Sequence, residues 1–275
     1  MSQTVLYEFQ KINTNTDTVL AIVTLNRPEK ANALNEEMIE SFQVVLDKIQ
    51  QEKNCRLMLL KGNGSHFCSG ADLGWMKKSA SLSYEENIRD AEGLSKVFEK
   101  LADLPFPTLA LAKGSTAGGG LGLLAACDLV VAEEKANFSL KEVRVGLLPA
   151  IILPYLVSKM QHACLHRFGL TAEVFSAQEA LQYGLITHVC KDRDIDPTLQ
   201  NIMNLLLQGA PNAQAKYKNL LKTLIHSKGS KMHFTCVEAI AKARCGEEGQ
   251  KGLASILSKT QAEWVESLPK DWKLP

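Results

Sequence analysis

Apolar residues in the first 190 positions follow two kinds of pattern. Nearly continuous apolar runs occupy residues 19–28, 55–62, 107–114, 127–134 and 185–191. Such runs are typical of strands buried on both faces of a sheet. Residues 35–52 and 83–102 instead carry apolar side chains at helical spacing, and Asn35 stands where a helix cap is favoured. This succession predicts an α/β fold with interior strands.

The pattern changes near residue 198, after which the spacing of apolar residues is helical only. The segments PNAQAKYKNLLKTLIH (211–226) and EEGQKGLASILSKTQAEWVESL (247–268) are both amphipathic in this sense. We therefore divide the chain into a core, residues 1–197, and a C-terminal helical region, residues 198–275. The helical region is expected to cover the core or to join subunits.

Composition and charge exclude several classes of function. The chain of 275 residues has 45% hydrophobic and 22% charged residues, as in ordinary globular proteins. A formal net charge of +1 gives no electrostatic reason to expect a nucleic acid or a membrane as partner. The start, MSQTVLYEFQ, does not resemble a signal peptide. Seven cysteines without a C-x-x-C pair favour reduced thiols and a cytoplasmic location.

The segment GSTAGGGLGLLAACD (114–128) places five glycines in nine positions, where a helix is expected to start. Glycine inside a helix costs about 1 kcal/mol relative to alanine, so this run needs a reason other than helix stability. It matches neither a dinucleotide-binding fingerprint nor a phosphate-binding loop. Free N–H groups at a helix start form an oxyanion hole in some enzymes. Tight packing of helix on strand is the alternative, and this run alone does not decide between them.

A second glycine loop, HFCSGADL (66–73), follows the strand expected at residues 55–62. Two backbone donors from separate loops are what a thioester oxygen needs when its α-carbon becomes enolate-like. This loop favours the oxyanion interpretation. Cys68, within it, is explained by the packing of a small residue, although a reactive thiol is the alternative.

Four motifs carry a resemblance to a known family. They are LNRPEKANAL (25–34), FCSGADL (67–73), AGGGLGLLAACDLVVA (117–132) and FSLKEVRVGLLP (138–149). In this order and spacing they resemble the crotonase, or enoyl-CoA hydratase/isomerase, superfamily. The resemblance implies a crotonase-like spiral of ββα repeats with a C-terminal helical region. It also implies an acyl-CoA thioester substrate, assembly as a trimer or dimer of trimers, and no metal or cofactor apart from the coenzyme A of the substrate.

The resemblance also assigns residues. The N–H groups of Ala71 and Gly119 would hold the thioester oxygen. Ser69 and Ala71 would line the adenine side of the coenzyme A site, with Lys30 and Ala31 near its pantetheine and phosphates. The remaining substrate-binding positions implied by the motifs are Gly70, Asp72, Leu73, Gly118, Gly122 and Lys259. Lys259 would act across a subunit boundary.

The chain departs from the family pattern at one catalytic position. Glu142 matches one of the two glutamates that flank the double bond in familiar hydratases, but Gly122 stands where the other is usual. We expect a hydratase in which Glu142 exchanges the α-proton. An isomerase using Glu142 alone and a catalytically silent acyl-CoA-binding homologue are the alternatives. The stretch KEVRVGLLPAIILPY resembles bacterial methylglutaconyl-CoA hydratases, and the missing side chain at 122 is expected to leave room for a branched or carboxylated acyl group.

Other candidate residues receive structural interpretations. Asp72 is expected to fix its loop, and Asp128 to stand at the start of a strand. His162 and His166 are four residues apart on an expected helix, a spacing that suits one metal ion. No third ligand is placed by the sequence, so we interpret them as a surface pair.

Overall fold

The computed structural model describes residues 3–13, 16–225 and 230–275. Its centre is a six-stranded sheet in the order β1-β2-β3-β4-β6-β9, in which β1 pairs antiparallel with β2 and the other pairs are parallel. A second sheet has three strands in the order β5-β7-β8. The strands are β1 (Val5–Lys11), β2 (Val19–Leu25), β3 (Cys55–Gly62), β4 (Thr108–Ala112), β5 (Ser115–Ala117), β6 (Leu129–Glu133), β7 (Asn137–Ser139), β8 (Val174–Ser176) and β9 (His188–Cys190).

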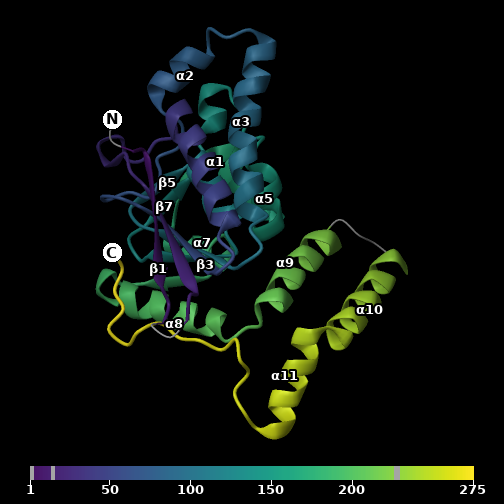
Figure 1. The fold of residues 1–275 in the computed structure, drawn as a ribbon. Helices are drawn as coiled ribbons and strands as arrows, with labels where there is room; N and C mark the ends of the chain where they lie inside the picture. The colour runs from purple at the N-terminus through teal and green to yellow at the C-terminus, as the bar shows by residue number, and fades with distance from the viewer. Residues whose placement is uncertain (1–2, 14–15, 226–229) are drawn as a thin grey trace.

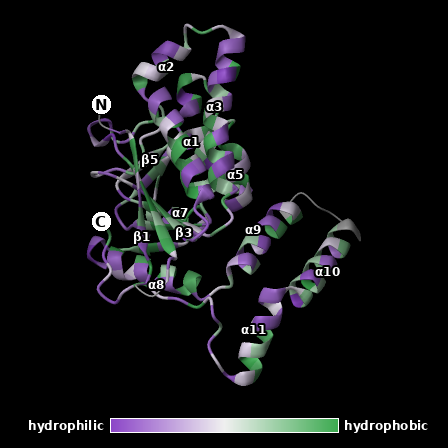
Figure 2. Cartoon of the chain, in the orientation of Figure 1, coloured by the Kyte–Doolittle hydropathy of each residue, from purple (hydrophilic) through white to green (hydrophobic). Residues whose placement is uncertain are grey.

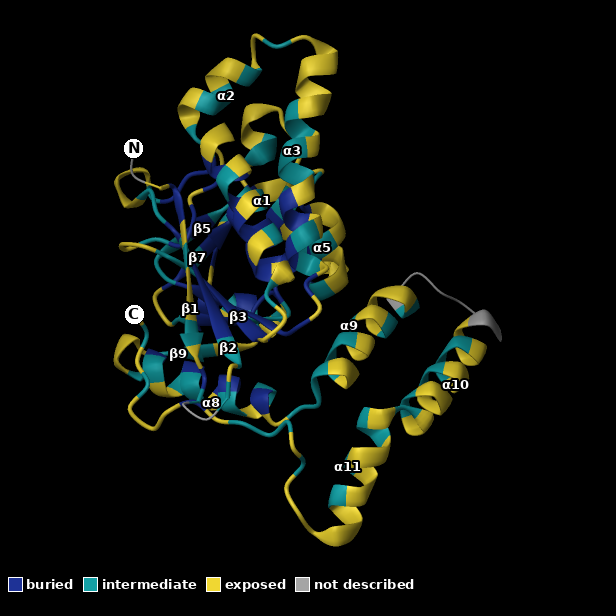
Figure 3. Cartoon of the chain, in the orientation of Figure 1, coloured by how far each residue is buried: buried dark blue, intermediate teal, exposed yellow. Residues whose placement is uncertain are grey.

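The interior strands β2, β3, β4 and β6 of the larger sheet are buried on both faces, as their continuous apolar runs predict. In β3, Met58 and Leu60 belong to the cluster formed with the helices α1 and α3, whereas Leu57 and Leu59 belong to the cluster formed with α8. Alternation of this kind follows from the two-residue period of a strand. Figure 3 shows the strands and the inward faces of these helices as the buried part of the molecule.

Helices surround these sheets and extend the chain beyond them (Figure 1). Those of the first part are α1 (Glu36–Gln51), α2 (Leu73–Ser79), α3 (Tyr84–Ala102), α4 (Gly119–Ala126), α5 (Leu153–Lys159), α6 (His162–Thr171) and α7 (Ala177–Gln182). Those of the last part are α8 (Ile195–Leu207), α9 (Pro211–Ile225), α10 (Ser230–Cys245) and α11 (Glu247–Ser258). Short 3-10 helices are η1 (Pro28–Lys30), η2 (Glu142–Val145) and η3 (Asp192–Asp194). Asn35 caps α1 as expected, since its side chain accepts a bond from Met38 N.

A repeated ββα unit places the loops of interest side by side. In β4-β5-α4 and in β6-β7-α5, the first strand joins the larger sheet and the second joins the smaller one. Each unit therefore turns a corner between two sheets, which produces a spiral. The three-residue strands of the second sheet are too short to leave a clear alternation in the sequence, and we did not predict them.

The C-terminal part differs from its expectation in two ways. Residue 197 lies inside α8, whose Leu199 and Met203 are buried against the larger sheet. The expectation of helices throughout is wrong for residues 259–275, because α11 ends at Ser258 and Lys259 takes a left-handed conformation. The tail then returns to the core, where Arg56 donates a 2.9 Å bond to Trp264 O.

Helices α9, α10 and α11 project from one side of the molecule (Figure 1). In the view of Figure 2 they show both apolar and polar residues, and large apolar side chains on them are exposed. They pack mainly on one another, with a few contacts from α9 to the core, such as the Lys218–Asp128 ion pair at 2.6 Å. Among the described residues, no helix is both long enough and apolar enough to cross a bilayer.

Candidate active site

The two glycine loops are in contact at the start of α4. Ala117 N donates a 2.9 Å bond to Cys68 O, and Cys68 forms an isolated parallel bridge with Thr116. A Cβ atom added to Gly70 would lie 3.1 Å from Ala117 O, and one added to Gly118 would lie 3.8 Å from Gly70 Cα. The loop that contains Ala71 and the loop that leads into Gly119 are therefore neighbours, as the motifs imply.

Two backbone donors are free at this junction. In the bridge between Leu34 and Ala71, the bonds run from Leu34 N to Gly70 O and from Asp72 N to Leu34 O, so the Ala71 N–H is not used. Gly119 is the first residue of α4, where an N–H has no acceptor within its helix. Across the described residues, neither N–H donates to another protein group. Both are available to an oxygen atom, and the one on α4 lies at the positive end of the helix dipole.

Glu142 brings its carboxyl group to the same junction. It begins η2, which is separated from β7 by two residues, and its Oε1 atom would lie 2.9 Å from a Cβ added to Gly118. Its Oε2 atom is buried and has no hydrogen-bond partner among the described residues. Burial raises the pKa of the Glu142 carboxyl above its ordinary value. A half-buried carboxyl with one unpaired oxygen beside two free donors can move a proton at a carbon atom next to a bound carbonyl.

The glycines at positions 118 to 120 have separate physical reasons. Gly118 has φ +48° and ψ −120°, a conformation that other residues rarely adopt, and it faces Glu142. A Cβ at Gly119 would lie 2.8 Å from the end of the Leu34 side chain. One at Gly120 would lie 2.6 Å from the backbone oxygen of Cys68. Tight packing therefore explains Gly120, whereas Gly118 admits a carboxyl group.

The space at Gly122 is filled, which corrects one expectation. A Cβ atom there would lie 2.3 Å from Ile152 Cγ2 and 2.9 Å from Phe98 Cε1. The missing side chain thus leaves no room for a branched acyl group, because Ile152 occupies its place. The usual second glutamate has no space here without rearrangement of α5.

Asp72 fixes its loop, as expected. Its side chain accepts from Gly74 N and Trp75 N and so caps α2, and it forms a 3.0 Å ion pair with Arg27. Both side chains of the pair are largely buried, at 14% and 17% exposure. Burial opposes ionisation of Asp72, but its bonds to Arg27, Gly74 N and Trp75 N together lower the pKa of the carboxyl. These bonds leave Asp72 in a structural role beside Ala71.

The residues expected to bind coenzyme A lie on two adjacent loops, residues 30–34 and 69–72, which we call the loop pair. Ser69 N donates to Ala31 O at 3.0 Å, and Ser69 Oγ donates to Lys30 O at 3.4 Å. Lys30, Ser69 and Leu73 are exposed, so each is accessible to a ligand. The structure brings these residues together with Gly70 and Ala71. Lys259, by contrast, follows α11, which lies at the opposite end of the molecule from α2 (Figure 1).

Sequence reasoning missed two residues that hold these loops. Arg27 pairs with Asp72 and also donates to Ala33 O at 2.5 Å. Asn32 is fully buried. Its Oδ1 atom accepts a hydrogen bond from Arg27 N, and its Nδ2 atom donates to Asn63 O and His66 O. Its φ of +54° is a conformation that asparagine tolerates. Both residues lie within the motif LNRPEKANAL (25–34), and their place in this motif is the sequence signal that could have identified them.

The structure also shows the surroundings of the remaining candidate residues, namely one cysteine, one aspartate and two histidines. Burial raises the pKa of the Cys68 thiol to about 12, so this cysteine is a packing residue and not a reactive one. Asp128 precedes β6, as expected. His162 and His166 lie on α6, and the described residues contain no group of three or more His, Cys, Asp or Glu placed to hold a metal.

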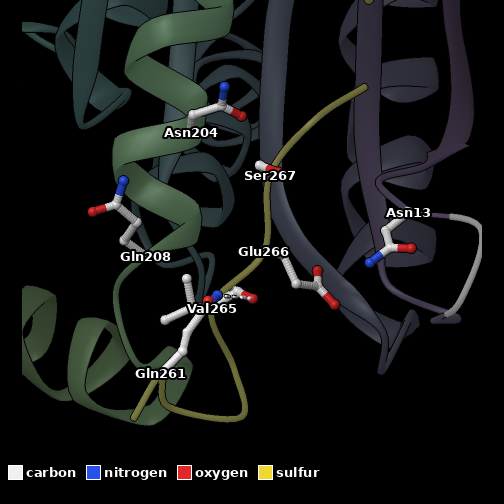
Figure 4. Close-up of a pocket in the computed structure, with 7 residues that line it drawn as sticks. All are labelled: Asn13, Asn204, Gln208, Gln261, Val265, Glu266 and Ser267. Atoms are coloured by element: carbon white, nitrogen blue, oxygen red, sulfur yellow. Dashed lines mark hydrogen bonds between the residues drawn. The ribbon is translucent and has the colours of Figure 1, made fainter. Parts of the chain in front are cut away.

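A cavity of about 560 Å³ lies elsewhere, between α8 and the C-terminal tail (Figure 4). Its lining is polar apart from Val265, and its carboxylate, Glu266, accepts bonds from the Thr18 hydroxyl. None of the expected site residues lines this cavity. A smaller cavity of about 280 Å³ lies beside Asp72 and Trp75, next to the loop pair.

Comparison with known proteins identifies the family and the fold of the chain. The family model described as enoyl-CoA hydratase/isomerase matches residues 15–267. A putative enoyl-CoA hydratase of Thermus thermophilus is 32% identical over 205 residues, which cover 74% of this chain and 81% of that protein. A trans-2-decenoyl-[acyl-carrier-protein] isomerase of Streptococcus mutans is 27% identical over 216 residues, covering 78% and 82%. The crystal structure of an enoyl-CoA hydratase from Shewanella pealeana has a TM-score of 0.88 and 35% identity, covering 95% and 96%.

The chain therefore belongs to the enoyl-CoA hydratase/isomerase, or crotonase, superfamily. The crotonase fold expected from the motifs is confirmed. Enzymes of this family act on acyl-CoA substrates, which supports an acyl-CoA as the partner of the site.

Proposed function

We propose that this protein is an enoyl-CoA hydratase that adds water across the 2,3 double bond of an enoyl-CoA thioester. One observation carries the proposal: the Glu142 carboxyl, whose Oε2 atom has no partner among the described residues, lies against Gly118, beside the free N–H groups of Ala71 and Gly119. This arrangement supplies both a group that moves a proton and two donors for a developing negative charge.

In the proposed reaction, the thioester oxygen accepts hydrogen bonds from Ala71 N–H and Gly119 N–H. The oxygen of water forms a bond to the β-carbon, and the π electrons move toward the thioester oxygen as an enolate. Glu142 takes a proton from the attacking water and returns a proton to the α-carbon. The carboxylate is regenerated, and no cofactor is required apart from the coenzyme A that the substrate carries. Lys30, Ala31 and Ser69 bind that coenzyme A from the exposed side of the loop pair.

An isomerase is the second candidate, and the filled space at Gly122 favours it. Ile152 takes the place where a second glutamate would project, so Glu142 is the one carboxyl group at the two motif positions. A single base suffices to move a proton between two carbon atoms, whereas hydration must also orient water. The names of the relatives include both reactions.

The acyl group of the proposed substrate is branched or carboxylated. This part rests on the likeness of KEVRVGLLPAIILPY to methylglutaconyl-CoA hydratases and no longer on space at position 122. The exposed side chains of Leu73, at the end of the second glycine loop, and of Leu147 and Leu148, just after η2, offer an apolar surface for a branched group.

We further propose that the chain assembles as a trimer or a dimer of trimers. Exposed apolar side chains on the projecting helices support this, among them Tyr217, Val237, Ile256 and Leu257. In such an assembly, Lys259 would approach the coenzyme A of a neighbouring subunit. Light scattering on the eluting protein tests the mass, and a monomer at micromolar concentration would contradict the proposal.

Mass spectrometry of CoA thioesters tests the reaction. Crotonyl-, 3-enoyl- and 3-methylglutaconyl-CoA are incubated with the protein in ordinary and in ¹⁸O- or deuterium-labelled water. Gain of one labelled water identifies a hydratase, and the fastest substrate identifies the acyl group. A shifted double bond without added oxygen identifies an isomerase. If no thioester changes, the protein is an acyl-CoA-binding homologue without catalysis.

Two variants test the assignment of Glu142. Glu142→Gln is expected to lower kcat by about 10²–10⁴, the range for a positioned acid or base. Glu134→Gln is the matched control, since it removes an exposed carboxylate in the turn between β6 and β7. Full turnover by Glu142→Gln on every active thioester would show that the assignment is wrong.

A further inference from the structure

A lysine lies at the end of α4 opposite the free N–H groups. Lys159 is the last residue of α5, and its Nζ atom donates hydrogen bonds to three backbone oxygens at the end of α4. These belong to Leu124 (3.4 Å), Cys127 and Asp128 (3.3 Å). One ammonium group therefore binds the Leu124 carbonyl, which the end of the helix leaves without an intrahelical partner, and the carbonyls of the two residues that follow α4.

Packing against Leu34, Cys68 and Ile152 holds the sides of α4, and the Lys159 ammonium adds hydrogen bonds at its C-terminal end. The helix has eight residues, which are apolar or glycine, and no side chain caps its start at Gly118. At about 1.5 Å per residue, its two ends are about 12 Å apart. The hydrogen bonds of the helix make it a stiff rod, so a displacement at the end held by Lys159 also displaces Gly119.

The charges near Lys159 suit this role. The Asp128 carboxylate is already engaged by Thr108 N, by the Thr108 hydroxyl and by Lys218, whose Nζ atom lies 2.6 Å from Oδ2. The hydrogen-bond acceptors of the Lys159 ammonium are thus backbone oxygens at the negative end of the helix dipole. Burial and the nearby Lys218 charge lower the pKa of Lys159, and the Asp128 charge opposes this shift.

We propose that Lys159 is a positioning residue that holds the end of α4 so that the Gly119 N–H is aimed at the thioester oxygen. This inference rests on the proposed function, because it requires that oxygen to lie beside Gly119. Lys159 does not touch the substrate and acts through the helix. Loss of its hydrogen bonds weakens polarisation of the thioester carbonyl while leaving the coenzyme A loops, residues 30–34 and 69–72, unchanged.

The primary test uses infrared spectroscopy of butyryl-CoA labelled with ¹³C at the carbonyl, bound to the protein. The wild-type protein is expected to shift the carbonyl stretch to lower frequency than in water. Lys159→Met is expected to lose a large part of this shift, and Lys159→Arg, which retains the charge and donors, to keep most of it. Lys53→Met, which removes an exposed lysine between α1 and β3, is the control and should match the wild type.

Kinetics on an active enoyl-CoA give a second measurement. Displacement of a catalytic group by about 1 Å can cost about 10²-fold in rate, so we expect Lys159→Met to lower kcat by about ten- to a hundredfold. KM is expected to change less than threefold, roughly, because the residues proposed to bind coenzyme A, such as Lys30 and Ser69, belong to segments other than α4. If Lys159→Met does not fold, as judged by circular dichroism, Lys159→Gln and Lys159→Arg are compared instead at low temperature.

The outcomes separate the inference from the proposed function. A wild-type carbonyl shift that persists unchanged in folded Lys159→Met or Lys159→Gln overturns the inference alone. Equal losses of kcat in Lys159→Met and Lys159→Arg also overturn it, since the donors would then be irrelevant. Absence of any shift in the wild-type protein overturns both, because no oxyanion contact would exist.

Discussion

Replacing Glu142 by glutamine is expected to separate catalysis from stability. The amide keeps the shape of the side chain but removes the charge that lies buried beside Gly118. Activity should fall, as argued above, whereas the folded protein should become more stable at neutral pH. A residue that serves only the fold would show the opposite result, since its loss lowers stability.

The magnitude follows from the environment of the carboxyl group. Oε2 of Glu142 is buried without a hydrogen-bond partner, and an unsatisfied buried group costs about 1–3 kcal/mol, or more when it is charged. Glutamine also leaves a polar group at this place, so the substitution removes only the additional cost of the charge. The side chain is only partly buried, so we take the lower end, about 1 kcal/mol. In a protein of this size, 1 kcal/mol raises Tm by about 2–4 °C.

The pH dependence gives the sign of the effect. Burial raises the pKa of Glu142 above its ordinary value of 4.5, so the folded protein binds this proton more tightly than the unfolded chain does. The contribution to stability is complete below pH 4.5 and is lost as pH rises through the folded pKa. Wild-type protein and Glu142→Gln should thus have similar Tm values in acid and diverge toward neutral pH.

Differential scanning fluorimetry of the wild type, Glu142→Gln and the control Glu134→Gln between pH 4 and 8 measures this difference. The reasoning is refuted if Glu142→Gln melts below the wild type at pH 8. It is equally refuted if the difference in Tm is the same at every pH, because the destabilisation would then not come from the charge of the Glu142 carboxylate. The acid limb of kcat/KM should show the same raised pKa.

Three further predictions concern the packing at Gly122, the ion pair of Asp72 and the reactivity of the cysteines. Gly122→Ala should lower the free energy of unfolding by about 1–3 kcal/mol in urea titrations, and adding Ile152→Ala should recover part of it, because the two side chains compete for one space. Asp72→Asn should raise KM more than it lowers kcat in steady-state assays. It should also lower the free energy of unfolding at pH 7 but not in strong acid, because the lowered pKa of Asp72 stabilises the fold only where the carboxyl is ionised. Maleimide at pH 7.5 should label the exposed Cys245 and leave Cys68 unmodified until the protein unfolds, as peptide mapping will reveal.

The sequence predicted the elements that are long and strongly patterned. The strand at Cys55–Gly62 and the helices after Asn35 and Ser83 lie where the apolar spacing placed them. The short strands of the second sheet were not predicted, because three residues are too few to show alternation. The end of α11 was misplaced, since Lys259 takes a left-handed conformation without the glycine that usually signals one.

The sequence by itself determined the family, the two glycine loops and Glu142, because these depend on residue types at fixed spacings along the chain. Only the tertiary structure decided which space is open and which is filled. Whether Gly122 leaves room depends on Ile152, thirty residues further along, and the orientation of the α4 helix depends on Lys159 in another element. Such contacts join positions that are distant in the chain, so no local pattern records them, and they follow only from the packing of α5 against α4.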